Sequence, residues 1–350
     1  MKVYIGTYTQ DLLTGKKTGS DGIYLCDFDD ASGCLKILES YSSSANPSFL
    51  SLSWDGSLLL AVNELLGEGA LDTYRVSQEG HLSHLDRVHF SGSACCHAEL
   101  APNGSFVVAV HYGEGEVFAY QLDEGRFKQR TASFFNEGFG PVPSRQAGPH
   151  THSAKRIPGK ERFVVCDLGC DLISFYRYDS SGHLFRDDSL SLNTPPGRGP
   201  RHSAFTADGN RLYISCELSN SVLYYRWESG KYVLMQEISS LPVDSSGHSA
   251  AADIHLSCCG DHLYVSNRGH DSIAHFVLDA LGFMGHPGYQ LCGGNTPRHF
   301  AITRRHLLCA NQDSGDITVL PLDENGELGR KSTSVSVPAA ACIITTQKHT

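Results

Sequence analysis

The chain has 350 residues, a formal net charge of −10 and a composition that is 40% hydrophobic and 19% charged, as expected of a soluble globular protein. The acidic balance and the lack of a basic stripe argue against nucleic acid or an anionic membrane as the main partner. No apolar run approaches the roughly 20 residues that span a bilayer.

The first segment, residues 2–8, alternates apolar and polar side chains and predicts a β-strand. It is too short and too alternating for a secretory signal. The twelve cysteines include two adjacent pairs and match neither a zinc ligand spacing nor a disulfide framework. We therefore expect reduced, mostly buried cysteines in a cytoplasmic protein.

A repeat of about 50 residues organises the rest of the chain. Turn glycines separate a mixed strand from a strongly apolar one at intervals of 48, 55, 50 and 51 residues, at Gly56, Gly104, Gly159, Gly209 and Gly260. The apolar strands are expected at 58–62, 106–110, 163–165, 212–214 and 263–265, and after a shorter turn at 307–310. An alternating third strand follows each from the second copy on, at 116–120, 172–176, 221–225, 272–276 and 316–320. A variable fourth strand completes the unit, which is typical of a β-propeller blade.

The two ends of the chain decide the number of blades. Six complete units start at Asn46, Ala94, Gly148, Gly199, Gly247 and Thr296. Residues 338–344 resemble only a first strand, whereas residues 2–8, 22–28 and 34–38 supply a second, a third and a fourth. Together they predict a seventh blade closed by both termini, which removes exposed sheet edges. The prediction is one all-β domain, a seven-bladed β-propeller over residues 1–350.

Polar residues recur at two fixed places in this repeat. Seven residues before the turn glycine lie Phe49, His97, His152, His202 and Asp253, with His299 as counterpart in the shortened unit. Eight residues after it lie Glu64, Tyr112, Asp167, Glu217 and Arg268, with Gln312 as counterpart. A hairpin folded at the glycine brings the two places together, so we expect two polar rings at one mouth of the central channel. Packing alone does not call for so many ionisable groups.

These side chains suit acid–base chemistry on an anion. Imidazole or carboxylate groups with a pKa near neutrality can activate water, and arginine binds phosphate or carboxylate and stabilises an oxyanion. The sequence His150-Thr151-His152 has a spacing found in metal sites, but neighbouring arginines repel a dication. We therefore predict no metal and no cofactor. A Gly-x-Ser-x-Gly elbow, a Walker loop and a Rossmann fingerprint are absent.

With these residues in place, the sequence resembles the seven-bladed lactonase family, which includes propeller-type 6-phosphogluconolactonases and the fungal carboxy-cis,cis-muconate cyclases. The matching phrases fall about once per blade and include "NPSFLSLSWDGSLLLAVNE" at 46–64, "GPHTHS" at 148–153, "GPRHSAFTADGNRLYISCEL" at 199–218, "YVSNRGHDSIAHF" at 264–276 and "TPRHFAI" from 296. The resemblance implies catalytic roles for His152, Arg201, Glu217 and Arg268. Cys216 departs from the Asn that usually precedes this Glu.

The implied activity is hydrolysis of 6-phosphogluconolactone, a small phosphorylated sugar lactone, in the pentose phosphate route. Glu217 or His152 would activate water, Arg201 would stabilise the oxyanion, and Arg268 and Arg298 would hold the phosphate. The remaining substrate-binding candidates are His97, His150, His202, His299 and Gln312. Two alternatives stay open: a carboxy-muconate cycloisomerase that uses the same site, and a non-catalytic propeller that binds a protein or a sugar.

Overall fold

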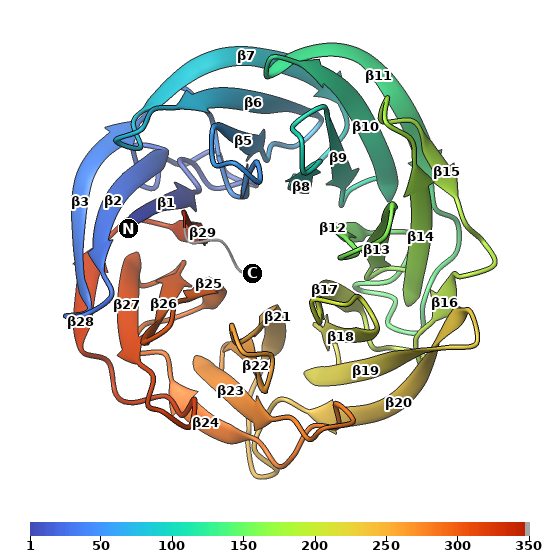
Figure 1. The fold of residues 1–350 in the computed structure, drawn as a ribbon, viewed down its shortest axis with the longest axis vertical. Coiled ribbons are helices and arrows are strands. Elements are labelled where there is room, and N and C mark those ends of the chain that lie inside the picture. The colour runs from blue at the N-terminus through green and yellow to red at the C-terminus, as the bar shows by residue number, and fades with distance from the viewer. Residues whose placement is uncertain (347–350) are drawn as a thin grey trace.

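The computed structural model describes residues 1–346 as a ring of seven β-sheets, or blades, around a central axis (Figure 1). Blade 1 contains β29 (Ala340–Thr345), β1 (Lys2–Thr7), β2 (Ile23–Asp29) and β3 (Cys34–Tyr41). Blade 2 contains β4 (Leu50–Leu52), β5 (Leu58–Asn63), β6 (Glu68–Val76) and β7 (Leu82–Ser91). Blade 3 contains β8 (Cys95–Leu100), β9 (Phe106–His111), β10 (Glu116–Asp123) and β11 (Arg126–Phe135).

The other four blades follow in chain order. Blade 4 contains β12 (Thr151–Arg156), β13 (Arg162–Asp167), β14 (Leu172–Tyr178), β15 (Leu184–Arg186) and β16 (Leu192–Asn193). Blade 5 contains β17 (Pro200–Phe205), β18 (Arg211–Cys216), β19 (Ser221–Glu228) and β20 (Lys231–Ser239). Blade 6 contains β21 (Ala250–Leu256), β22 (His262–Arg268), β23 (Ser272–Val277) and β24 (Gly288–Leu291). Blade 7 contains β25 (Pro297–Ile302), β26 (His306–Asn311), β27 (Asp316–Pro321) and β28 (Thr333–Ser336).

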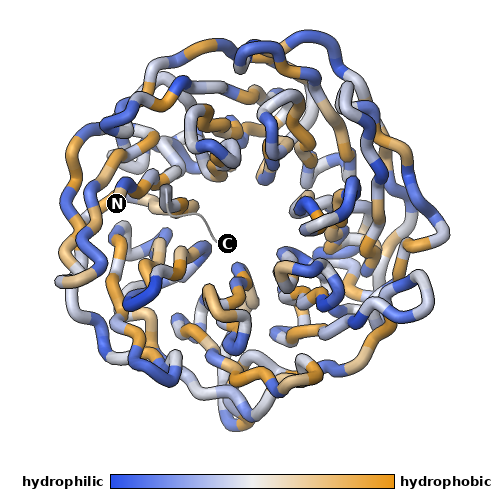
Figure 2. Tube along the Cα trace, viewed as in Figure 1, coloured by the Kyte–Doolittle hydropathy of each residue, from blue (hydrophilic) through white to orange (hydrophobic). Residues whose placement is uncertain are grey.

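The second strand of each blade is apolar through most of its central residues because it is covered on both faces. All six residues of β5, for example, are buried. Seven hydrophobic clusters fill the spaces between neighbouring blades, one cluster to each space, and orange segments recur in every blade around the ring in Figure 2. The hydrophobic core is therefore divided among the seven interfaces between neighbouring blades, and the central channel is lined by polar side chains.

The ring closes as the sequence predicts. Strand β1 pairs antiparallel with β2 on one side and with β29 on the other, so the two ends of the described chain share a sheet. Their side chains pack with blade 7 in one cluster that includes Val3, Ile5, Leu308 and Ile343. The seven-bladed, all-β prediction is confirmed. The single-domain prediction extends to residues 347–350, which lie outside the described residues.

Two further observations bear on the expectations from composition. Within residues 1–346, no helix is long and apolar enough to cross a membrane. All twelve cysteines are free thiols, and most are buried.

Candidate active site

The first strand of each blade lies nearest the axis of the ring (Figure 1), and in several blades it carries a β-bulge near its start. The bulge leaves one residue unpaired with the second strand, and such an extra residue is often aimed at a site. In blades 3, 4, 5 and 7 the unpaired residues are Cys96, His152, Arg201 and Arg298. All four line one small cavity in the channel.

Glu217 lies at the centre of a group of arginines. It follows the end of β18, where its N–H donates to the carbonyl of Gly199 at 2.8 Å. Arg201 Nε donates to its carboxylate at 3.0 Å and Arg145 Nη2 at 2.6 Å, and Arg268 Nη2 lies 2.7 Å from Oε2. The carboxylate therefore has a cation on three sides.

This surrounding charge determines the protonation of the group. Burial alone would raise the pKa of Glu217, but Arg268, Arg201 and Arg145 hold it well below its usual value. Burial and the charge of Arg268 lower the pKa of Arg201 to about 9, so its guanidinium stays charged at neutral pH. Glu217 is thus a permanent anion that orients arginines, and its oxygens are occupied by their N–H groups instead of being open to a water proton.

A fourth arginine, Arg298, lines the small cavity together with Arg201. Arg298 Nη1 donates to Gln312 Oε1 at 3.3 Å, and its Cζ lies 5.3 Å from the centre of the Tyr8 ring. Tyr8 in turn donates to Glu64 Oε2 at 2.7 Å. Burial lowers the pKa of Arg298, but Tyr8 and Glu64 more than offset this and raise it above the ordinary value. The site thus holds a fourth fixed cation.

The small cavity lies among these groups and the channel imidazoles. Its volume is about 10 Å³, and it is lined by Ser48, Phe49, Cys96, His152, Arg201, His202, Arg298, His299 and Ala341. This space is close to the minimum that admits one water molecule, and its polar lining offers several hydrogen-bond partners. His152 Nδ1 is buried and has no hydrogen-bond partner among residues 1–346. Burial and Arg201 keep the pKa of His152 well below its usual value, so the ring is neutral.

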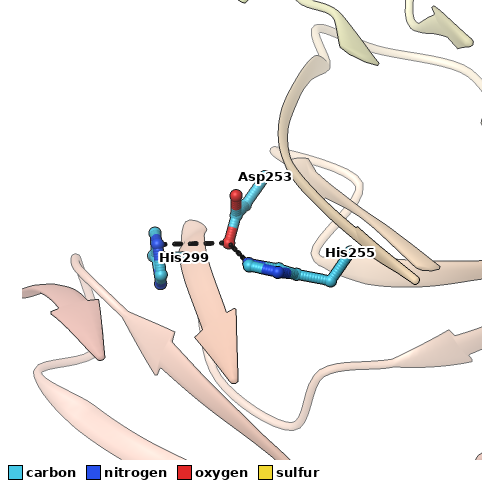
Figure 3. Close-up of side chains that lie close together, drawn as sticks. All are labelled: Asp253, His255 and His299. Carbon is cyan, nitrogen blue, oxygen red and sulfur yellow. Dashed lines mark hydrogen bonds and ion pairs between the residues drawn. The ribbon is translucent and has the colours of Figure 1, made fainter. Parts of the chain in front are cut away.

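A network of imidazoles surrounds Asp253. Oδ1 of Asp253 accepts from His202 Nδ1 at 2.9 Å, and Oδ2 accepts from His255 Nε2 at 2.8 Å. His299 Nε2 lies 3.4 Å from Oδ2 (Figure 3). Asp253 and His255 both come from β21, two residues apart and on the same face of the strand. The network reaches a larger cavity of about 840 Å³, which also borders Trp54, Lys155 and Arg211.

Asp253, His255 and His299 are the described residues that come nearest to a metal-ligand set, with ligand atoms within 4.8 Å of one another. The hydrogen bonds favour a different arrangement. The N–H of Ile343 points at His299 Nδ1 at 3.4 Å, so the proton of this ring is on Nε2 and faces the carboxylate. A metal needs a lone pair on that nitrogen. The trio is better described as a hydrogen-bonded network.

The other predicted site residues lie as follows. His150 is at the rim, stacked on Tyr112 with ring centres 4.5 Å apart. His97 is stacked on Phe49 at 3.9 Å and borders the larger cavity, so it belongs with the imidazole network rather than with the arginines. Sequence reasoning missed Arg145, which lies in the loop between β11 and β12 and has no counterpart in the repeat. It also missed Tyr8, although Tyr8 lies in the first predicted strand, residues 2–8.

One predicted pairing is wrong. Asp167 was expected in the ring that contains Glu217, yet it pairs with Thr151, and its carboxylate accepts from Asn136 Nδ2 and from backbone N–H groups of the local turn. Leu168 takes the place of Glu217 in blade 4, because its N–H donates to the carbonyl of His150 as that of Glu217 does to Gly199. His152 is therefore the counterpart of Arg201 and Arg298, one residue away from the expected register.

Known proteins resemble this chain along nearly its full length. The 6-phosphogluconolactonase of Bacillus subtilis is 31% identical over 97% of both chains, and that of Formosa agariphila is 31% identical over 93% of this chain and 94% of its own. The solved structure of the periplasmic gluconolactonase PpgL of Pseudomonas aeruginosa superposes with a TM-score of 0.88, at 28% identity and 98% coverage of both chains. The family model described as "Lactonase, 7-bladed beta-propeller" matches residues 2–345. The chain therefore belongs to the seven-bladed β-propeller lactonase family.

Proposed function

We propose that this protein hydrolyses a phosphorylated sugar lactone, with 6-phosphogluconolactone as the substrate. The observation that carries the proposal is the placement of Arg145, Arg201 and Arg268 around one buried carboxylate, directly beside a neutral imidazole and a cavity of water size. A lactone hydrolase needs fixed cations where the oxyanion develops, and it needs a place for one water. The name of the Bacillus subtilis relative agrees with this substrate.

The charge balance of the site favours an anionic substrate. The site contains four guanidiniums and two carboxylates, so its net charge is +2. These groups belong to Arg145, Arg201, Arg268, Arg298, Glu64 and Glu217. The chain as a whole carries −10, but fixed arginines in a buried site dominate the field at short range. We assign the phosphate to Arg268 and Arg298 and the carbonyl oxygen to Arg201.

The two catalytic groups left open by the sequence take different roles. Glu217 holds the arginines in place and remains ionised, for the reasons given above. His152 is neutral and lies beside Arg201 in the cavity lining, where its ring N–H can donate to the developing oxyanion. A neutral imidazole is a suitable donor for this purpose.

We place this reaction in the pentose phosphate route of the cytoplasm. The support is the substrate class together with the sequence expectation of reduced cysteines, and all twelve thiols are free. To test the location, the tagged protein is fractionated and the fraction of its cysteines that are reduced is measured in cell extracts. We expect the protein in the cytoplasmic fraction, with reduced thiols. The Pseudomonas aeruginosa relative is periplasmic, so recovery in the periplasm would overturn the location without affecting the reaction.

The experiment compares lactones. The purified protein is incubated with freshly made 6-phosphoglucono-1,5-lactone and with glucono-1,5-lactone at pH 6.5, and proton release is followed against the uncatalysed rate. We expect kcat/KM for the phosphorylated lactone to exceed that for the other by at least roughly 100-fold, the value of two charge-assisted hydrogen bonds. In Arg201→Ala the rate should fall to that in buffer, while Arg226→Ala, which removes a partly exposed arginine paired with Glu228, should keep the wild-type rate.

Each outcome has a separate meaning. Hydrolysis no faster than in buffer would refute the lactonase proposal, and equal rates for the two lactones would refute the phosphate assignment. The cycloisomerase alternative is tested in the same plate with carboxy-cis,cis-muconate, whose consumption in place of the lactones would show that the arginines bind carboxylates.

A further inference from the structure

His202 differs from the other imidazoles of the channel in how its ring is held. Its Nδ1 lies 2.9 Å from Oδ1 of Asp253, which is only 2% exposed. An ionised carboxylate only accepts hydrogen bonds, so Nδ1 carries the proton. In a neutral ring this leaves a lone pair on Nε2. The backbone N–H of Phe300 also donates to Asp253, at 3.1 Å, and helps to fix the carboxylate.

The ring is neutral at physiological pH. Burial and the positive charge of Arg201 lower the pKa of His202 to about 3, although the hydrogen bond to Asp253 acts in the opposite direction. The titratable groups that face it come from five blades, its own included, and are His97, His152, Arg201, Asp253 and His299. His202 lines the small cavity together with Arg201 and His152, and its ring centre lies 5.3 Å from that of His152.

The other ionisable groups of the cavity lack this combination of features. The proton of His299 faces Asp253, and its Nδ1 already accepts from Ile343. His152 Nδ1 has no partner within residues 1–346, so no carboxylate selects its tautomer. Glu217 does not line this cavity, and its carboxylate is bonded to three arginines. Among the described groups of the cavity, His202 alone has a fixed tautomer with a free lone pair.

We propose that His202 is the proton acceptor of the hydrolysis and that Asp253 is its positioning residue. This inference rests on the proposed function. The oxygen of a water in the small cavity forms a bond to the lactone carbonyl carbon, and one water proton moves to His202 Nε2. The carbonyl electron pair moves onto oxygen, beside Arg201. Collapse of this intermediate breaks the bond between the carbonyl carbon and the ring oxygen, which takes the proton back from His202. The product is the open hydroxy acid.

The arrangement follows from the fold. Arg201 and His202 are adjacent at the bulge of β17. Arg201 can therefore stabilise the oxyanion while His202 accepts the proton of the water. Asp253 comes from the first strand of the next blade, at the equivalent place in the ring. A positioned imidazole of this kind contributes roughly 10²- to 10⁴-fold to the rate.

Two variants test the assignment. His202→Asn keeps an N–H donor near the position of Nδ1 but removes the acceptor nitrogen, and Asp253→Asn keeps the size of the side chain but removes the charge. We expect each to lower kcat by roughly 10²- to 10⁴-fold and to change KM by less than about threefold, because neither holds the phosphate. The matched control is Asp72→Asn, another buried carboxylate, which is bonded to His84 Nε2 at 2.8 Å in blade 2. Its kcat should stay within about twofold of wild type.

A second readout does not depend on activity. Nitrogen-15 NMR of the histidine side chains should show the proton of His202 on Nδ1 in the wild type and a mixture of tautomers in Asp253→Asn. If the wild type hydrolyses lactones and both variants stay within tenfold of its kcat, or if the proton is found on Nε2, the inference is wrong while the proposed function stands. If the wild type hydrolyses no lactone, the proposed function fails and this inference fails with it. Should Asp253→Asn not fold, His202→Asn and the wild-type spectrum decide the outcome.

Discussion

Acidification should destabilise this protein at a pH where its carboxylates are still ionised. Burial lowers the pKa of His202 to about 3 and those of His275 and His299 to about 4. In the unfolded chain the same groups titrate near 6.5. Below that pH the unfolded chain binds protons that the folded protein does not, so stability is present above pH 6.5 and is lost as the pH falls.

The size of the effect follows from these values. At pH 5 each such imidazole favours unfolding by about 2 kcal/mol, so the three together contribute about 6 kcal/mol. The pKa values of His97 and His152 are also lowered by burial and nearby positive groups, which adds to the loss. Total stabilities of folded domains are about 5–15 kcal/mol. We therefore expect unfolding to begin at about pH 5, above the range in which Glu217 is protonated.

The measurement is urea unfolding at pH 7, 6 and 5, followed by circular dichroism. His275→Gln removes one of these imidazoles away from the channel and should reduce the difference between pH 7 and pH 5 by about 2 kcal/mol. His81→Gln changes a side chain that is 58% exposed and should leave the difference as it is. Equal free energies of unfolding at pH 7 and pH 5 would show that the buried histidines are protonated in the folded protein.

Three further results are expected. Glu217→Gln should lower kcat/KM by more than 100-fold, because three guanidiniums lose the carboxylate that orients them. Loss of one partner of a buried ion pair costs about 3–5 kcal/mol. Wild-type kinetics in this variant would contradict the proposal that Glu217 orients the arginines. Arg298→Ala should raise KM for the phosphorylated lactone roughly 10-fold or more while changing KM for the unphosphorylated one little, which steady-state kinetics on both lactones will show. Incubation with EDTA should leave the rate unchanged, since the proton of His299 faces Asp253; a loss that zinc or manganese restores would instead assign a metal to this trio.

The number of blades could be predicted because it depends on features that every blade needs. The second strand is covered by two neighbouring blades, so its central residues are mostly apolar, and a glycine with positive φ lies in the hairpin before it in five units. These two signals recur at a spacing set by the size of a blade. The N-terminal unit lacks a first strand and the C-terminal unit has only a first strand, so the two together predict one blade. The pairing of β1 with β29 forms this blade.

The register within a blade was less predictable, and blade 4 shows why. Its first hairpin has the same length as that of blade 5, since Ile157 N–H donates to Arg162 O as Thr206 N–H donates to Arg211 O. The glycine occupies the third place of the loop in blade 4, at Gly159, but the fourth in blade 5. An alignment on glycines therefore moved His152 and Asp167 by one residue, and a shift of one residue in a strand reverses the face on which a side chain lies.

The arginines around Glu217 illustrate the same limit for the site. Arg201 is the bulged residue of a first strand and Arg268 is the last residue of a second strand. Spacing in the repeat found Arg268 directly, whereas Arg201 lies one residue before the position that the spacing selected, His202, and entered through the family resemblance. Arg145 comes from the long connection between β11 and β12, which is absent from the other blades, and only the folded ring brings it within 2.6 Å of Glu217. A repeat specifies where polar groups can gather, whereas the insertions in it complete a particular site. Lactonases of this family that lack a cation at the place of Arg145 should therefore bind anionic lactones more weakly, which Arg145→Ala in this chain tests directly.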